Sequence, residues 1–185
     1  MRPAGFLVAL LLAAFAAAPA SAAFQYYVFR EFGVAKEFPL EPTRREAEYR
    51  TPLLGRAVPA TIFETTEDNM VYRFTVADMR AVDLVARSAG LYAECIAMAE
   101  AEGKVLARMP QRVEDGTAFR VYGQLTSVDL AEAGGRKQTN CFLNKGWLYK
   151  VESIVLPARG EPNAAAALRF STSLRFRIDQ APDSP

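Results

Sequence analysis

The chain has 185 residues, with 22 basic residues, 21 acidic residues and no histidine. This even balance gives no bulk electrostatic attraction to nucleic acid or to an anionic membrane, and an apolar content of 51% excludes a disordered chain. Without histidine, a single chain forms neither Ser-His-Asp nor Cys-His catalytic sites nor imidazole-based metal sites, so we expect no cofactor and favour a role other than catalysis.

Residues 1–22 are predicted to be a secretory signal peptide. Arg2 precedes an uninterrupted apolar run at residues 6–18, after which come a proline and a triplet of small residues that ends at Ala22. This order is typical of a cleavable signal, and the run is shorter than the ~20 residues that span a bilayer. We expect cleavage after Ala22 and a periplasmic or secreted protein. Its mature chain would have no integral membrane span and no excess of either charge.

The first half of the mature chain predicts an aromatic segment, a charged segment and a β-hairpin. Residues 24–38 are rich in aromatic side chains, which fits a short strand or an irregular cover over the core. Residues 43–50 are charged and are expected to form a surface helix or loop. Residues 58–66 and 70–76 are β-branched and aromatic and flank a Glu-Asp-Asn turn signal, which predicts a β-hairpin.

A long helix is predicted next. Thr75 and Asp78 have the spacing of a capping box at a helix start, and Gly103 follows Glu102 as a stop signal. Apolar side chains at helical spacing lie on two nearly opposite faces of this segment, so only a narrow polar strip remains. A helix that is apolar nearly all round is a buried one, and we expect residues 24–38 to cover its back.

Four more strands are predicted after the helix, at residues 104–109, 117–126, 147–156 and 168–178, the last with the cleanest period-2 alternation. Residues 128–146 and 159–167 are expected to be long loops. The order β-β-α-β-β-β-β predicts an α+β fold in which one curled antiparallel sheet of about six strands packs around a single long buried helix. Cystatin-like and hot-dog-like folds are compatible with this order, although the chain carries no sequence motif of either family. We expect a single domain at residues 23–178 and a flexible tail at 179–185.

Cys95 and Cys141 are the two cysteines of the chain. In an oxidising compartment an even pair favours one disulfide, and the loop that it would close gives an entropic stabilisation of about 4 kcal/mol. The alternative is that Cys95 is a small buried apolar residue. Because the two are not arranged as C-x-x-C, a bridge would stabilise the fold rather than carry redox chemistry.

The sequence carries no catalytic constellation that commits to a reaction. Glu64, Glu67 and Asp68 lie near the predicted hairpin turn, and Glu94 and Glu102 lie on the predicted helix. Nothing in this pattern shows two carboxyl groups facing each other across a cleft, as a glycosidase requires. The phosphate-binding motifs G-x-x-x-x-G-K-[ST] and G-x-G-x-x-G do not occur, and no EF-hand loop indicates calcium.

Arg169, Arg175 and Arg177 are predicted on the outward face of the last strand. Guanidinium groups suit carboxylate or phosphate partners, so these three residues form a candidate binding surface. The alternative is that their charges protect an edge strand or pair with acids on the neighbouring strand.

The sequence leaves three functional hypotheses. The first is an exported, non-enzymatic protein that binds an envelope protein or component, as an accessory subunit, an inhibitor or an immunity-type protein. The second is a carrier of an apolar small ligand in a curled-sheet cavity lined by Tyr92, Trp147, Tyr149 and Phe170, side chains for which core packing is the alternative. The third is a hot-dog-like or carboxylate-based enzyme. None of the three involves nucleic acid.

Overall fold

The computed structural model describes residues 23–114, 120–130, 134–155 and 164–178, so the predicted signal peptide and tail lie outside the described residues. The strands are β1 (Gln25–Phe29), β2 (Val34–Phe38), β3 (Thr43–Arg50), β4 (Ala57–Glu67), β5 (Met70–Asp78), β6 (Gly103–Glu114), β7 (Arg120–Leu130), β8 (Arg136–Asn144) and β9 (Trp147–Val155). The helices are α1 (Leu84–Glu100), α2 (Ala164–Thr172) and the short 3-10 helix η1 (Arg30–Phe32). β1 and β2 form a hairpin, and the other strands form a seven-stranded antiparallel sheet in the order β3-β4-β5-β9-β8-β7-β6.

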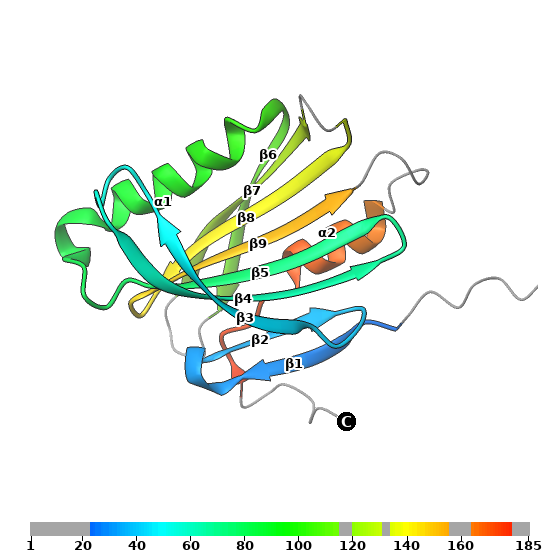
Figure 1. Cartoon of the computed structure of the whole chain (residues 1–185), viewed down its shortest axis with the longest axis horizontal. Coiled ribbons are helices and arrows are strands. Elements are labelled where there is room, and N and C mark those ends of the chain that lie inside the picture. Colours follow the sequence, from blue (N-terminus) through cyan, green and yellow to red (C-terminus); the bar gives the residue numbers. More distant parts are fainter. Residues whose placement is uncertain (1–22, 115–119, 131–133, 156–163, 179–185) are drawn as a thin grey trace, which may run out of the picture.

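Three layers make up the fold (Figure 1). α1 packs on one face of the large sheet, mainly against β8 and β7. α2 and the β1–β2 hairpin cover the opposite face, where α2 contacts β9, β8 and β2. This is an α+β fold, as the sequence predicts, but the sheet is not curled around one buried helix, and the described residues form two α-helices rather than one.

α1 begins later than the sequence pattern predicts. β5 pairs with β4 and with β9 along its length, so Thr75 and Asp78 belong to this strand and not to a capping box. The Asp83 carboxylate caps the helix instead, because it accepts hydrogen bonds from two amides of the first turn at 3.1 and 3.3 Å. Strand pairing on both sides of β5 thus uses the backbone groups that a helix starting there would need.

α1 is also not the all-round buried helix that its two apolar faces predict. Of its residues, only Leu91, Cys95 and Ala99 are buried, whereas Val85 is 100% exposed. Residues 24–38, which the sequence offered as a cover for this helix, lie on the other face of the sheet as β1 and β2. α1 therefore presents one narrow stripe to the sheet and leaves apolar side chains on its outward side.

The strand predicted at residues 168–178 is instead the end of α2 and an extended segment. Phe170 is buried while Leu168 is 44% exposed, which is a helical pattern, since a strand would bury both. After the helix, Arg175 forms one isolated bridge to β2, and Leu174 and Phe176 enter the same core as Phe170. The prediction is wrong because residues four positions apart, such as Phe170 and Leu174, satisfy both the helical and the strand period.

Two strands of the large sheet fall in segments predicted as helix or loop. β3 is an edge strand, and most of its side chains are charged and exposed, so no apolar alternation marks it. β8 lies within the predicted loop at 128–146, and its buried positions include Lys137, Thr139 and Asn140. Apolar periodicity cannot find a strand whose inward side chains are polar. The hairpin of β4 and β5 is confirmed, with Asp68 in its turn at a φ of 53°.

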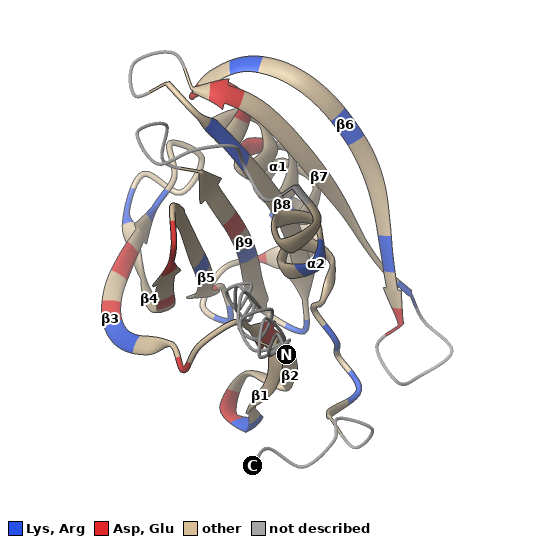
Figure 2. Cartoon of the chain, turned by 90° about the vertical axis from the view of Figure 1, so that its right-hand side faces the viewer, with Lys and Arg blue, Asp and Glu red and all other residues tan. Residues whose placement is uncertain are grey.

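The long edge strand β6 and its neighbour β7 leave the rest of the sheet at one end. They pair over their full length, as far as the Glu114–Arg120 pair. β7 and β8 pair only as far as the Gly123–Phe142 pair. In Figure 2 the β6–β7 ribbon accordingly runs away from β8 toward its turn.

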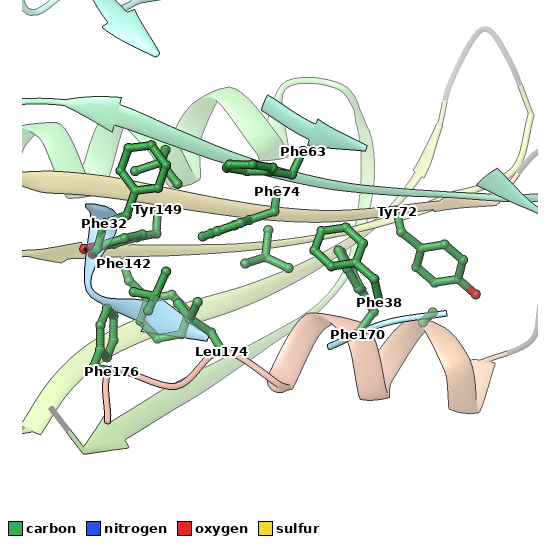
Figure 3. Packing of buried hydrophobic residues seen from close by; sticks show 14 of the residues in the cluster. Phe32, Phe38, Phe63, Tyr72, Phe74, Phe142, Tyr149, Phe170, Leu174 and Phe176 are labelled. Carbon is green, nitrogen blue, oxygen red and sulfur yellow. Dashed lines mark hydrogen bonds between the residues drawn. The ribbon is translucent and has the colours of Figure 1, made fainter. Parts of the chain in front are cut away.

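An aromatic core fills the space between the large sheet and the layer of α2, β1 and β2 (Figure 3). Phe74 of β5 stacks on Tyr149 of β9 with ring centroids 6.2 Å apart, and Phe170 of α2 packs edge-on against Phe38 of β2 at 5.1 Å. Burying one such side chain contributes about 1.5–3 kcal/mol, so this core fixes the hairpin and α2 on the sheet. A second cluster joins α1 to the opposite face.

Candidate functional site

The three arginines predicted as a binding surface do not share a strand face. Arg169 lies on α2, where it donates to Glu37 at 2.6 Å and stacks over an aromatic ring at 4.8 Å. Arg175 follows α2 and donates to the carbonyls of Thr172 and Leu174 at 3.1 and 3.0 Å. The Arg177 side chain is partly buried. The first two guanidinium groups thus bind within the protein, and Arg169 pairs from α2 with an acid of β2, whereas the sequence alternative was a pair between neighbouring strands.

The four aromatic residues proposed to line a cavity lie on both faces of the sheet. Tyr149 and Phe170 belong to the aromatic core, where the Tyr149 hydroxyl donates to the Phe32 carbonyl at 2.9 Å. Trp147 packs against the ring of Phe32 at 5.0 Å. Tyr92 is on α1, on the other side of the sheet, so the structure does not bring the four together around one space.

Cys95 and Cys141 lie at disulfide distance, with their sulfurs 2.10 Å apart. Both are buried, and they connect the inward stripe of α1 to β8. The pairing agrees with the sequence prediction. It is compatible with an oxidising, extracytoplasmic location, where such bonds persist.

A groove lies where β7 and β8 part, between these strands and α1. Three residues of β7 and two of β8 extend beyond the last pair of their common ladder, so within the described residues each has a strand neighbour on one side only. The recess has a volume of about 380 Å³. We call it the fork groove, and it is lined by Ser88, Ala89, Tyr92, Arg120, Val121, Tyr122, Leu143 and Asn144.

The fork groove combines apolar and aromatic walls with basic groups at its rim. Tyr122 is 63% exposed, and the guanidinium of Arg112 on β6 lies 5.6 Å from the centroid of its ring. Val85 is fully exposed one helical turn before the α1 residues of the groove and on the same side of the helix. Arg120 is the one charged residue among the described residues that line the recess. Exposed tyrosine and arginine beside a recess are typical of protein-recognition surfaces.

A cluster of buried charges lies on the α1 face of the sheet, at the end of that helix. Glu152 pairs with Lys137 at 2.6 Å and with Lys150 at 2.8 Å, and Lys137 also pairs with Glu102 at 2.7 Å. Burial by itself raises the pKa of Glu152, but Lys150 and Lys137 outweigh this effect, so the pKa is lowered. A carboxylate held ionised in this way is a poor proton donor, and the cluster serves to fasten the chain after α1 to the sheet.

Lys36 of β2 is a buried cation at the C-terminal end of α2. Its Nζ donates to the Phe170 carbonyl and the Ser173 hydroxyl and lies 3.7 Å from the centroid of the Phe170 ring. The carbonyl end of a helix carries partial negative charge, which a cation complements. Burial lowers the pKa of Lys36 well below its ordinary value, although Glu37 acts in the opposite direction. Its position indicates a role in docking α2 onto the hairpin.

Lys36→Met is expected to change the pH dependence of stability. The pKa of this lysine is lowered in the folded protein and ordinary, near 10.5, in the unfolded chain, so between these values the unfolded state holds the extra proton. The wild-type free energy of unfolding should therefore rise with pH over this interval relative to Lys36→Met, by up to about 1.4 kcal/mol per pH unit. Urea unfolding at several alkaline pH values measures the difference. Lys104→Met, at an exposed position, is the control. A wild-type advantage that stays constant up to pH 10.5 contradicts a lowered pKa.

Comparison with known proteins does not assign the chain to a family, because no model of a protein family and no curated protein matches it. Among the described residues, no group of three or more cysteine, aspartate or glutamate side chains is placed to hold a metal ion. None of the helices in those same ranges has both the length and the apolar character needed to cross a membrane.

Proposed function

We propose that this protein is exported to the periplasm, has no enzymatic activity, and binds another envelope protein there as an accessory, inhibitory or immunity-type protein. The fork groove carries this proposal, because it places an exposed tyrosine and two partly unpaired strand ends around one recess. The cysteine pair at disulfide distance supports the location. The even charge balance gives no support to a nucleic-acid partner.

The packing of the aromatic core favours surface binding over the carriage of an apolar ligand. A carrier needs a cavity of roughly 300–1,000 Å³ lined by apolar side chains. Tyr149 and Phe170, proposed as part of such a lining, instead pack against neighbouring rings at 5.2 and 5.1 Å. These rings occupy the space that a ligand would need (Figure 3).

Three of the five carboxylates considered for an enzyme have partners given by the structure: Glu64, Glu94 and Glu102. Glu64 pairs with Arg73 at 2.5 Å, and Glu94 accepts a hydrogen bond from the Leu53 amide at 2.9 Å. Glu102 belongs to the buried ion cluster. These contacts give the three carboxylates a structural role and favour binding over catalysis.

Co-purification of the protein from the cells that produce it tests this proposal. Tyr122→Ser removes an exposed ring from the groove without removing a core side chain, and we expect it to reduce the amount of retained partner by at least about tenfold. Arg45→Ser is the matched control, because Arg45 is exposed on the opposite edge strand. Equal retention by wild type and Tyr122→Ser, or a wild-type protein that retains nothing, contradicts the proposal.

A further inference from the structure

Beyond Gly123 the backbone of β7 faces an open seam. The residues from Arg120 to Tyr122 pair with β6 on one side, and Leu143 and Asn144 pair with β9 on one side. Successive residues of a strand direct their N–H and C=O groups to opposite sides. Each of these two strand ends therefore directs at least one residue's backbone groups into the seam. An extended peptide can complete such an edge by adding a strand.

Side-chain packing holds the seam open. The Phe142 ring lies so close to Gly123 that an added Cβ would meet a ring carbon at 2.2 Å, and this contact coincides with the last pair of the ladder. Beyond it, Val121 is buried in the aromatic core, opposite Val113 of β6. The edge is therefore preformed, which lowers the entropic cost of binding.

The fork groove then selects the side chains of an added strand. Residues of a strand alternate between its two faces, so every second side chain would enter the groove. Its walls there are Tyr92, Tyr122 and Leu143, which suit an apolar or aromatic side chain. Three residues of β7 extend past Gly123, which corresponds to about 10 Å of strand, so the groove has room for one or two such side chains.

Charge at the rim favours acidic groups in the same segment. Arg120 lines the groove, and Arg112 lies over the Tyr122 ring. Glu114 is opposite Arg120 in the β6–β7 register, but the described contacts include no ion pair between them. The two arginines, Arg112 and Arg120, outnumber this one acid. Guanidinium groups bind carboxylates with paired, charge-assisted hydrogen bonds. Figure 2 shows further basic residues along β6, of which Arg108 pairs with Glu100 at 2.6 Å.

We propose that the fork groove binds an extended segment of the partner protein in which two groove-facing residues, two positions apart, are one apolar or aromatic residue and one aspartate or glutamate. The segment adds to β7 as a short strand. This inference rests on the proposed function, since it names the partner's binding segment for the same groove. A second copy of this chain and a folded partner surface are the competing occupants, and the experiment separates them.

Short capped peptides with valine or phenylalanine and glutamate two positions apart, and threonine at the positions between, are the probes, titrated into the mature protein by calorimetry. We expect the peptides to bind, and we expect Arg120→Glu to weaken binding by at least about tenfold because it reverses the charge at the rim. Arg45→Glu, on the opposite edge strand, should leave the affinity unchanged. Peptides with lysine in place of glutamate, and peptides with alternate amides N-methylated, should not bind. N-methylation removes the donors of strand pairing while keeping the side chains.

Three results overturn the inference. The first is an absence of binding by the wild-type protein, and the second is binding that survives Arg120→Glu or N-methylation. The third is a concentration-dependent dimer that Tyr122→Ser abolishes, because the occupant would then be a second copy. Partner co-purification that depends on Tyr122 while no peptide binds leaves the proposed function standing and removes only the extended segment. Co-purification that does not depend on Tyr122 removes the proposed function itself.

Discussion

Replacing Glu152 by glutamine is expected to lower the free energy of unfolding by about 3–5 kcal/mol. Glu152 is the shared partner of Lys137 and Lys150, and all three side chains are largely withdrawn from solvent. Glutamine keeps the size of the side chain but not its charge, so the buried Lys150 loses its counterion and Lys137 loses the more buried of its two. Glu102, the other acid of the cluster, is more exposed and pairs with Lys137, so it does not replace Glu152 beside Lys150.

Glu48→Gln is the matched control for this substitution. Glu48 pairs with Arg50 at 2.6 Å on the edge strand β3, where both side chains are more than half exposed. An exposed pair contributes roughly 0–1 kcal/mol, so this variant should unfold almost as the wild type does. Urea unfolding followed by the fluorescence of Trp147, the single tryptophan, measures both. Equal losses from the two variants would show that the buried cluster does not stabilise the fold.

The same cluster is expected to make the free energy of unfolding depend on pH in the acidic range. Burial raises the pKa of Glu152, but the two lysines outweigh it and lower the pKa below the ordinary value of 4.5. The resulting stabilisation is complete above that ordinary value and is lost as the pH falls toward the lowered one. Wild type should therefore lose more stability than Glu152→Gln between about pH 5 and pH 3. If the free energies of unfolding of the two proteins fall equally over this pH range, the pKa of Glu152 is not lowered by folding.

Replacing both Cys95 and Cys141 by alanine is expected to lower the free energy of unfolding by about 4 kcal/mol. The bridge joins positions 46 apart in the sequence, so it removes many conformations from the unfolded chain. It also fastens α1, which forms one wall of the fork groove, to β8, which forms another. We therefore expect partner binding to be lost at a lower urea concentration in this variant than in the wild type.

Wild-type protein in the presence of a reductant is the control for the alanine variant. Its urea midpoint should move toward that of the variant, whereas the reductant should leave the variant itself unchanged. A double variant whose stability lies within about 1 kcal/mol of the wild type contradicts a stabilising bridge. Two thiols that react with an alkylating reagent in unreduced, exported protein contradict the bridge itself.

Sequence patterns predict the elements whose side chains alternate between an apolar core and solvent, as in the β4–β5 hairpin. They miss β8 because polar residues occupy its buried positions, and the partners of those residues are distant in the chain. Asn140, for example, donates to the Ser171 carbonyl at 3.1 Å, and Lys137 reaches Glu102 after α1. They also misassign residues 168–178, where Phe170 and Leu174 satisfy two periods at once. Whether such a segment forms a helix or a strand depends on how it packs in the core, which the sequence of the segment alone does not contain.

The candidate site is only partly visible in the sequence. The alternation predicted for residues 117–126 places Arg120 and Tyr122 outward, and it therefore predicts an exposed aromatic side chain on this strand. The seam beside it depends on the end of the β7–β8 ladder, which the contact between Gly123 and Phe142 marks. That contact is not local, so no pattern within one strand predicts it.

Site-specific photo-crosslinking in the producing cell tests the binding role of the fork groove most directly. A photoreactive phenylalanine derivative replacing Tyr122 is expected to give a discrete crosslink to one envelope protein. The same amino acid replacing Arg45, on the opposite edge of the sheet, is expected to give none. Arg120→Glu in the first variant should abolish the crosslink. No crosslink from position 122, or equal crosslinks from both positions, would contradict a binding role for the groove.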